Sequence, residues 1–127
     1  MAIITTKAIV FNTIKYGDTS LIVKCFTFED GVKSYMIKGV LKSKKGKLKT
    51  AYFQPLTQLQ IVANHTNKQG LNSIREASII HPYNTLHTSI IKQTIVLFLS
   101  EILSSIIQEE EKNEALYMYI ETALVWL

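Results

Sequence analysis

The first eighty residues contain five runs rich in β-branched and aromatic residues, and this feature restricts the fold more than any other. Such runs, bounded by turn-forming residues, are typical of β-strands. Helix signals are absent from the same stretch. The expected strands are residues 3–14, 21–28, 32–40, 53–62 and 71–80. Five short strands must close on one another or be covered, because open sheet edges pair with other chains.

The boundary between the second and third runs carries the strongest turn signal. Asp30-Gly31 stands between two β-rich runs, and both residues tolerate the positive φ of a tight hairpin turn. We therefore expect an antiparallel hairpin here. At this length the economical closure is a five-stranded, partly open barrel of the OB-fold type, which we expect over residues 1–82. A small SH3-like barrel, or a meander sheet covered by helices, would fit the same periodicity.

Beyond Pro82 the hydrophobic period lengthens to three and four residues, which predicts an α-helix of about five turns or more. The residues that repeat at this period are Leu86, Ile90, Ile91, Ile95, Phe98, Ile102 and Ile106. Four others widen the apolar face: Val96, Leu99, Leu103 and Ile107. A face this wide indicates packing against more than one neighbour. The sequence thus predicts a chain of mixed β-then-α class, in which residues 83–127 begin a helical domain.

A second helix is expected to begin near Asn113, which suits an N-cap position, and to run to Leu127. Residues 123–127 contain no Gly, no basic residue and no polar tail, so no helix stop is visible. We expect that the helical domain is incomplete in this chain, or that a partner completes it.

The formal charge of +4 conceals two parts of opposite sign. Residues 1–83 hold eleven Lys and one Arg against four carboxylates, a net of +8. Residues 84–127 hold two Lys against six Glu, a net of −4. A field that attracts a polyanion therefore belongs to the first part alone.

Half of the basic residues of that first part stand in one segment, residues 38–49. Its six lysines are Lys38, Lys42, Lys44, Lys45, Lys47 and Lys49. Their mutual repulsion favours binding of an anion, and flexible lysines suit irregular phosphate positions. The alternative is a solvated charge run that only keeps a small barrel soluble. On a barrel of net +8 we favour nucleic acid, with Lys24, Lys33 and Arg75 as additional phosphate contacts.

Aromatic residues near a basic groove can stack on bases, at about 1 to 3 kcal/mol each. Tyr35 shares the strand alternation of Lys33 and is the candidate we select, while Tyr16 and Tyr52 are further possibilities. The alternative for any of these rings is a place in the barrel core or rim. For Phe26, Phe28 and Phe53 we expect the core or rim.

Enzyme chemistry requires convergent polar groups, and the sequence offers no persuasive set. His65 is expected in a hairpin loop, and His81 and His87 flank Pro82 without an evident third metal ligand. The single cysteine, Cys25, lies in an apolar run and is expected to be an inert core thiol. No Gly-rich phosphate loop of the nucleotide-hydrolase type is present. We therefore expect a protein that is not an enzyme, with no metal and no cofactor.

Targeting signals are also absent from the sequence. The N-terminus carries no charged leader and no small-residue cleavage site, which argues against a signal peptide. The unbroken apolar run from Ile95 to Leu99 has five residues, far short of the roughly 18 residues that span a bilayer. A cytoplasmic protein without a membrane partner is expected.

Several motifs, in order and at their spacings, resemble the bacterial DNA repair and recombination mediator family RecO. The motifs are Lys7-Ala8-Ile9-Val10, Tyr16-Gly17-Asp18-Thr19-Ser20-Leu21-Ile22-Val23, Gly31 with Lys38-Gly39-Val40, and Phe53-Gln54-Pro55-Leu56. The apolar helix and the Glu-rich break follow them in the same order. The resemblance extends over all 127 residues.

This resemblance implies an N-terminal OB-fold and a helical region in a bacterial, nucleoid-associated protein. Family members bind single- and double-stranded DNA, anneal complementary strands, and work with RecR and single-stranded DNA-binding protein to load recombinase. By position, the six lysines of residues 38–49 match the family's basic segment. Relatives often have Arg there, and the Lys residues of this chain favour non-specific phosphate contact over base reading. The family's zinc site, where present, lies in a later half that this chain does not contain.

Two other functions fit the same residues. The apolar helices could dock a partner, which would make the chain a protein-interaction adaptor with incidental lysines. An RNA-binding OB module of the translation apparatus shares the same physical features, and only the motif order argues against it.

Overall fold

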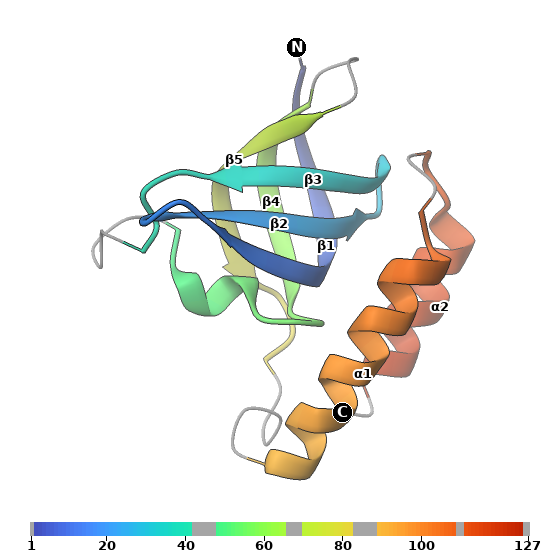
Figure 1. Cartoon of the computed structure of the whole chain (residues 1–127). Coiled ribbons are helices and arrows are strands. Elements are labelled where there is room, and N and C mark those ends of the chain that lie inside the picture. Colours follow the sequence, from blue (N-terminus) through green and yellow to red (C-terminus); the bar gives the residue numbers. More distant parts are fainter. Residues whose placement is uncertain (1, 42–47, 66–69, 83–88, 109–110, 126–127) are drawn as a thin grey trace.

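The computed structural model describes residues 2–41, 48–65, 70–82, 89–108 and 111–125. Within these residues a β-barrel is followed by a pair of α-helices (Figure 1). The strands are β1 (Ala2–Tyr16), β2 (Ser20–Thr27), β3 (Gly31–Ile37), β4 (Gln58–His65) and β5 (Leu71–Ile79). A short 3-10 helix, η1 (Thr50–Phe53), precedes β4, and the α-helices are α1 (Ile90–Ile106) and α2 (Glu114–Leu124).

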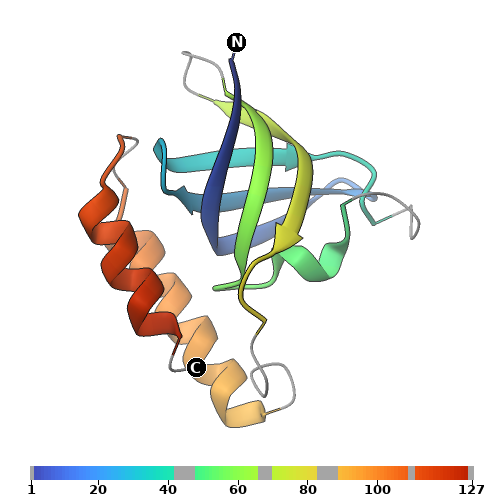
Figure 2. The same cartoon turned by 180° about the vertical axis from the view of Figure 1, so that it is seen from behind.

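The strands form a closed barrel in the order β1-β2-β3-β5-β4. Every neighbouring pair is antiparallel except β3 and β5, which run parallel. The long β1 pairs with both β2 and β4, and a bulge between Val10 and Asn12 bends it near the point where its pairing passes from β4 to β2 (Figure 2). The predicted barrel is therefore confirmed, as is the hairpin at Asp30-Gly31, where Gly31 has a φ of 68°.

Three predicted strand boundaries were wrong by three residues or more, and one of them is the end of the fourth strand, which lies at His65 and not at residue 62. The fourth strand begins at Gln58 and not at residue 53, because Pro55 lacks a backbone N–H and Leu56 adopts a φ of 60°. Residues 50–53 form η1 instead. The third strand ends at Ile37 and not at residue 40, since Gly39 turns the chain with a φ of 71°.

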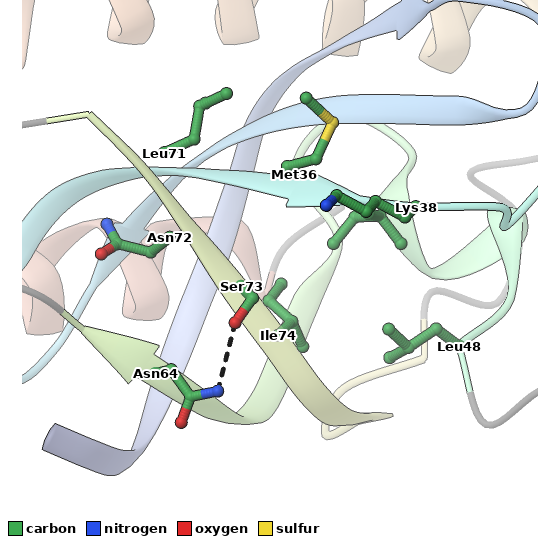
Figure 3. Close-up of a pocket in the computed structure, with 9 residues that line it drawn as sticks. Met36, Lys38, Leu48, Asn64, Leu71, Asn72, Ser73 and Ile74 are labelled. Carbon is green, nitrogen blue, oxygen red and sulfur yellow. Dashed lines mark hydrogen bonds between the residues drawn. The ribbon is translucent and has the colours of Figure 1, made fainter. Parts of the chain in front are cut away.

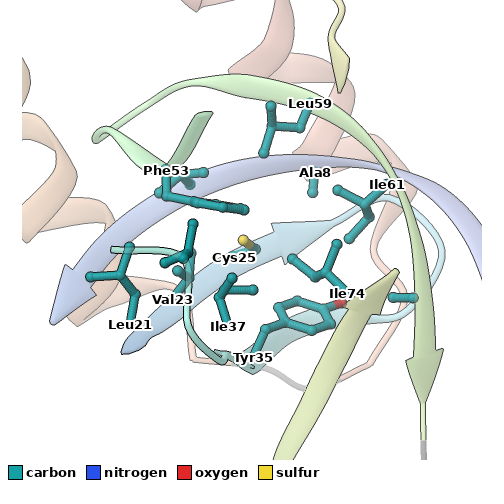
Figure 4. Close-up of a cluster of buried hydrophobic side chains, with 13 residues drawn as sticks. Ala8, Leu21, Val23, Cys25, Tyr35, Ile37, Phe53, Leu59, Ile61 and Ile74 are labelled. Carbon is teal, nitrogen blue, oxygen red and sulfur yellow. The ribbon is translucent and has the colours of Figure 1, made fainter. Parts of the chain in front are cut away.

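The barrel interior forms the first hydrophobic core (Figure 4). Alternate residues of β2 point inward, namely Leu21, Val23 and Cys25, and they meet Tyr35 from β3 and Phe53 from η1. The period of two that predicted the strands thus places their apolar faces inside. Cys25 is fully buried, as expected.

A second core joins the outer face of the barrel to the helices. Ile9, Phe11 and Phe26 point away from the interior and pack with Tyr117 and Ile120 of α2. The ring centroids of Phe26 and Tyr117 are 5.4 Å apart. Because the strands that carry these residues are apolar on both faces, the helices cover a surface that the barrel alone would expose.

Helix α1 meets the barrel through residues that widen its apolar face and through two serines. Its fully buried positions are Val96, Ser100 and Ser104, flanked by the half-buried Leu99 and Leu103. The small serines allow the helix to approach β1 closely, where Asn12 Nδ2 donates to Ser104 Oγ at 3.3 Å. The main apolar stripe predicted from periodicity lies outside this contact: Ile90, Ile91, Ile95, Phe98, Ile102 and Ile106 are all exposed.

Helix α2 begins as predicted, with Oδ1 of Asn113 accepting a hydrogen bond from Leu116 N. It ends at Leu124, while positions 126–127 lie outside the described residues. Lys7 Nζ on β1 reaches Glu121 of α2 at 3.0 Å and ties the helix to the barrel. Neither helix of the described chain is long and apolar enough to cross a membrane.

Candidate nucleic-acid interface

The basic segment leaves the barrel at the end of β3 and returns at η1. Lys38 follows β3 and Lys49 is the N-cap of η1, and both side chains are exposed. Among the described residues neither lysine pairs with a carboxylate. Lys42, Lys44, Lys45 and Lys47 lie outside the described residues. Both described ends of the segment therefore offer ammonium groups to an anion.

Backbone hydrogen bonds hold the β1–β2 turn against the start of this segment. Leu41 N donates to Thr19 O at 2.9 Å, and Gly39 N donates to Ser20 Oγ at 3.2 Å. The ring of Tyr16, 56% exposed, stands at this turn. Tyr16 is thus an exposed aromatic residue at a turn that is hydrogen-bonded to the start of the basic segment.

Arg75 is exposed on β5 and occupies a bulge. The β4–β5 register passes from Val62 opposite Glu76 to Ala63 opposite Ile74, so Arg75 is the extra residue. A bulge redirects the side chain that it carries. Since Ile74, its chain neighbour, lines the same cavity as Lys38, the fold brings Arg75 to the side of the barrel where the basic segment starts.

Lys24 is directed to the opposite side, toward helix α1. Its Nζ donates to both the carbonyl oxygen and the Oγ of Ser104, each at 2.9 Å. A phosphate contact by Lys24 would require it to leave both oxygens. The sequence analysis gave this lysine as an additional phosphate contact, and the sequence contained no sign of a helix packed against it.

Tyr35 is fully buried, which corrects the prediction that its ring stacks on a base. Its hydroxyl lies 2.6 Å from His65 Nε2, and Nδ1 of the same imidazole lies 2.9 Å from Asp30 Oδ2. Lys33 Nζ is 3.8 Å from that carboxylate oxygen. The prediction that places His65 in a loop was also wrong, because it ends β4 and is buried.

Burial perturbs the acidic groups of this interior. It raises the pKa of the Cys25 thiol from 9.0 to about 12, so the thiol stays protonated and is a poor nucleophile. Burial also raises the pKa of Tyr35, and the charges of Cys25 and Asp30 add to the shift. Both groups are neutral at physiological pH.

A cavity of about 600 Å³ opens where β3 and β5 separate (Figure 3). Met36 and Lys38 from β3, Leu71 and Ser73 from β5, and Leu48 before η1 contribute to its lining. Its walls are mostly apolar, and a cationic side chain stands at its edge. It is the hollow on the barrel surface that adjoins the basic segment.

Metal ligands are not assembled in the described part of the chain, where no three His, Cys, Asp or Glu side chains form a group that suits a metal ion. His81 is half-buried after β5, and His87 lies outside the described residues. The described residues therefore do not include a pair of His81 and His87 that could bind a metal ion.

The closed barrel with strand order β1-β2-β3-β5-β4 and a basic β3–β4 connection defines a protein of the OB-fold class. Residues 1–83 match the family model "Recombination protein O N terminal", RecO_N. The match covers more than half of the chain, so the chain belongs to this family. The resemblance inferred from the motifs is confirmed.

Curated relatives extend this similarity into the helices. The chain is 55% identical over 124 residues to "DNA repair protein RecO" of Flavobacterium psychrophilum and 52% identical to the protein of that name from Flavobacterium johnsoniae. Each match covers 98% of this chain and 52% of the relative. A relative from Salinibacter ruber is 31% identical over 123 residues. The chain thus spans about half the length of the curated relatives it matches.

Proposed function

We propose that this chain is the DNA-binding part of a non-catalytic recombination mediator that acts in DNA repair. The observation that carries the proposal is the concentration of exposed basic side chains around the end of β3, where Lys38 and Lys49 flank the lysine-rich segment. The similar proteins are named for DNA repair, and the OB-fold class commonly binds oligonucleotides. No cofactor is required for this role.

The binding mechanism is electrostatic. Each Lys that neutralises a phosphate releases condensed counterions, and this release drives association without reading sequence. Lysine is a compact charge with rotatable donors, which suits phosphates at irregular positions better than base edges. Arg75 on its bulge and the exposed ring of Tyr16 flank the same region and are the additional contacts that we assign to DNA.

Annealing follows from the same charge. Neutralising two strands at once lowers their mutual repulsion, and Watson–Crick pairing then selects the match. We propose that the chain binds both single- and double-stranded DNA in the bacterial cytoplasm, at the nucleoid. RecR, single-stranded DNA-binding protein and, indirectly, recombinase are the partners that we assign to the whole protein.

The proposal is tested by the rate at which the chain anneals complementary labelled strands. A variant with five lysines changed to Ala should lose most of the acceleration, and the matching Lys→Arg variant should keep it because its charge is retained. The five positions are Lys42, Lys44, Lys45, Lys47 and Lys49. Equal annealing by the Ala variant, shown by circular dichroism to be folded, would contradict the proposal. Complementary RNA strands should show whether the activity requires deoxyribose.

A second candidate function is docking of a protein partner on helix α1. Its outer stripe exposes large apolar side chains, among them Ile91 at 74% and Phe98 at 65%. Apolar patches of this kind mark interaction surfaces. Phe98→Glu should leave DNA binding intact and weaken binding of purified RecR, whereas unchanged RecR binding would remove this candidate.

A further inference from the structure

The parallel seam between β3 and β5 is the shortest part of the barrel closure. Among the described residues, the pairs across it are Ser34 with Leu71 and Tyr35 with Asn72. Beyond these pairs the two strands separate, and the cavity of about 600 Å³ opens between them. We call this cavity the β3–β5 slot. The slot differs from the basic segment because it is a cavity with mostly apolar walls, whereas the basic segment offers only positive charge.

Strand alternation determines the walls and the floor of the slot. Met36 and Lys38 on β3 point outward, as do Leu71 and Ser73 on β5 (Figure 3). Inward-pointing side chains close the floor, since Ile37 is 2% exposed and Ile74 is 7% exposed. The result is an apolar recess with an ammonium group on its rim.

Polar groups at the slot can recognise the edge of a flat ring. Asn64 Nδ2 donates to Ser73 Oγ at 3.2 Å, and this contact leaves the Asn64 amide oxygen and the Ser73 hydroxyl hydrogen for other bonds. The β3 and β5 main chains beyond the last paired residues also face the opening. A recess with apolar walls and a few convergent donors and acceptors is typical of a small-molecule site.

We propose that the β3–β5 slot receives one unstacked base of a single strand whose phosphates are held by Lys38 and Lys49. This inference rests on the proposed function. Charge complementarity selects the occupant, because a nucleotide combines an anion with an apolar ring, as the slot combines a cation with apolar walls. An apolar peptide would make no ion pair with the ammonium group at the rim. A free phosphate would make no apolar contact with Met36 and Leu71.

The slot also predicts a preference between DNA forms. Bases of a duplex are stacked and paired, and removing one from the stack costs free energy. A single strand offers its bases at much lower cost. The slot should therefore favour single-stranded over double-stranded DNA, although phosphate contacts alone bind both forms.

The test compares two labelled single strands of equal length and phosphate count, one with all its bases and one with abasic sites. Leu71→Ala removes one wall of the slot, and Ile79→Ala is the matched control because it truncates an apolar side chain of similar exposure on the same strand, 43% against 47%. Leu71→Ala should weaken binding of the intact strand about tenfold and leave binding of the abasic strand unchanged. Ile79→Ala should change neither.

A second variant fills the slot rather than emptying it. Ser73→Tyr places a ring at an exposed position and should abolish the preference for the intact strand while keeping salt-sensitive binding. If Leu71→Ala and Ser73→Tyr bind both strands as the original chain does, the base-binding slot is overturned and the phosphate site remains. If the original chain binds neither strand, the proposed function fails, and the slot assignment fails with it.

Discussion

The hydroxyl of Tyr35 lies 2.6 Å from Nε2 of His65 inside one end of the barrel. Since an ionised carboxylate can only accept, Nδ1 of the imidazole donates to Asp30, while Nε2 of the same ring faces the tyrosine hydroxyl. The chain of contacts joins β3, β4 and the β2–β3 turn. Tyr35, which the sequence pattern suggested for stacking on a base, is thereby used to hold the barrel closed.

Removal of the tyrosine hydroxyl should destabilise the fold. Tyr35→Phe leaves His65 Nε2 buried without this partner, and an unsatisfied buried polar group costs about 1 to 3 kcal/mol. Urea unfolding followed by circular dichroism should show that loss in the free energy of unfolding. Tyr16→Phe, at an exposed ring, should remain within about 0.5 kcal/mol of the original chain. Equal stability of the two variants would contradict the structural role of the Tyr35 hydroxyl.

Stability should fall at alkaline pH because of Cys25. Between 9.0 and about 12 the unfolded chain loses the thiol proton while the folded chain keeps it. The contribution is therefore present below pH 9 and is lost as pH rises, at about 1.4 kcal/mol per pH unit. Between pH 8 and about 9.5 most of the unfolded Tyr35 is still protonated, because its ordinary pKa is 10.0, and in this range Cys25→Ala should flatten the pH dependence. If the free energy of unfolding changes with pH equally in Cys25→Ala and in the original chain, burial does not raise the pKa of the Cys25 thiol.

Lys24 should act in packing, and Lys49 in binding. Lys24→Ala removes two hydrogen bonds to Ser104 and should cost about 1 to 3 kcal/mol of unfolding free energy. Its affinity for DNA should change little once the variant is folded. Lys49→Ala should show the reverse pattern, because its side chain is exposed. Thermal unfolding and fluorescence anisotropy on both variants separate the roles, and a reversed outcome would contradict this assignment.

The ion pair of Lys7 and Glu121 should couple α2 to the barrel. The Lys7 ammonium also lies over the rings of Phe28 and Tyr117, at 5.0 and 5.4 Å from their centroids. A double-mutant cycle with Lys7→Met and Glu121→Gln should give a coupling free energy of about 0.5 to 1 kcal/mol that declines with added salt. Coupling of zero at low salt would mean that the pair is fully solvated.

Much of the fold was predictable because the strand period and the turn residues act locally. Asp30-Gly31 determined the hairpin, and Asn113 marked the start of α2. Local patterns did not reveal η1. Pro55 and the positive φ of Leu56, which lie between η1 and β4, interrupt what resembled one continuous strand. Local patterns also did not show which part of the wide apolar face of α1 meets the barrel. Ser100 and Ser104 are polar in any hydropathy pattern, yet their small size suits the close contact.

The positive charge of the candidate site could be predicted from the sequence, but the position of its cavity could not. The density of lysines in residues 38–49 is visible in the sequence, but the slot depends on Met36 and Leu71, which are distant in the chain and meet only across the parallel seam. The burial of Tyr35 also could not be predicted locally. It results from closure of the barrel, and the alternation of residues along a strand does not show which of its two faces the barrel encloses.

The salt dependence of single-strand binding tests the central claim most directly. The slope of log K against log salt should be less steep by about 0.7 for each lysine that neutralises a phosphate. Changing Lys42, Lys44, Lys45, Lys47 and Lys49 to Ala should therefore flatten the slope strongly, and changing them to Arg should preserve it. A slope that is the same for the Ala variant and the original chain would contradict DNA binding through the basic segment.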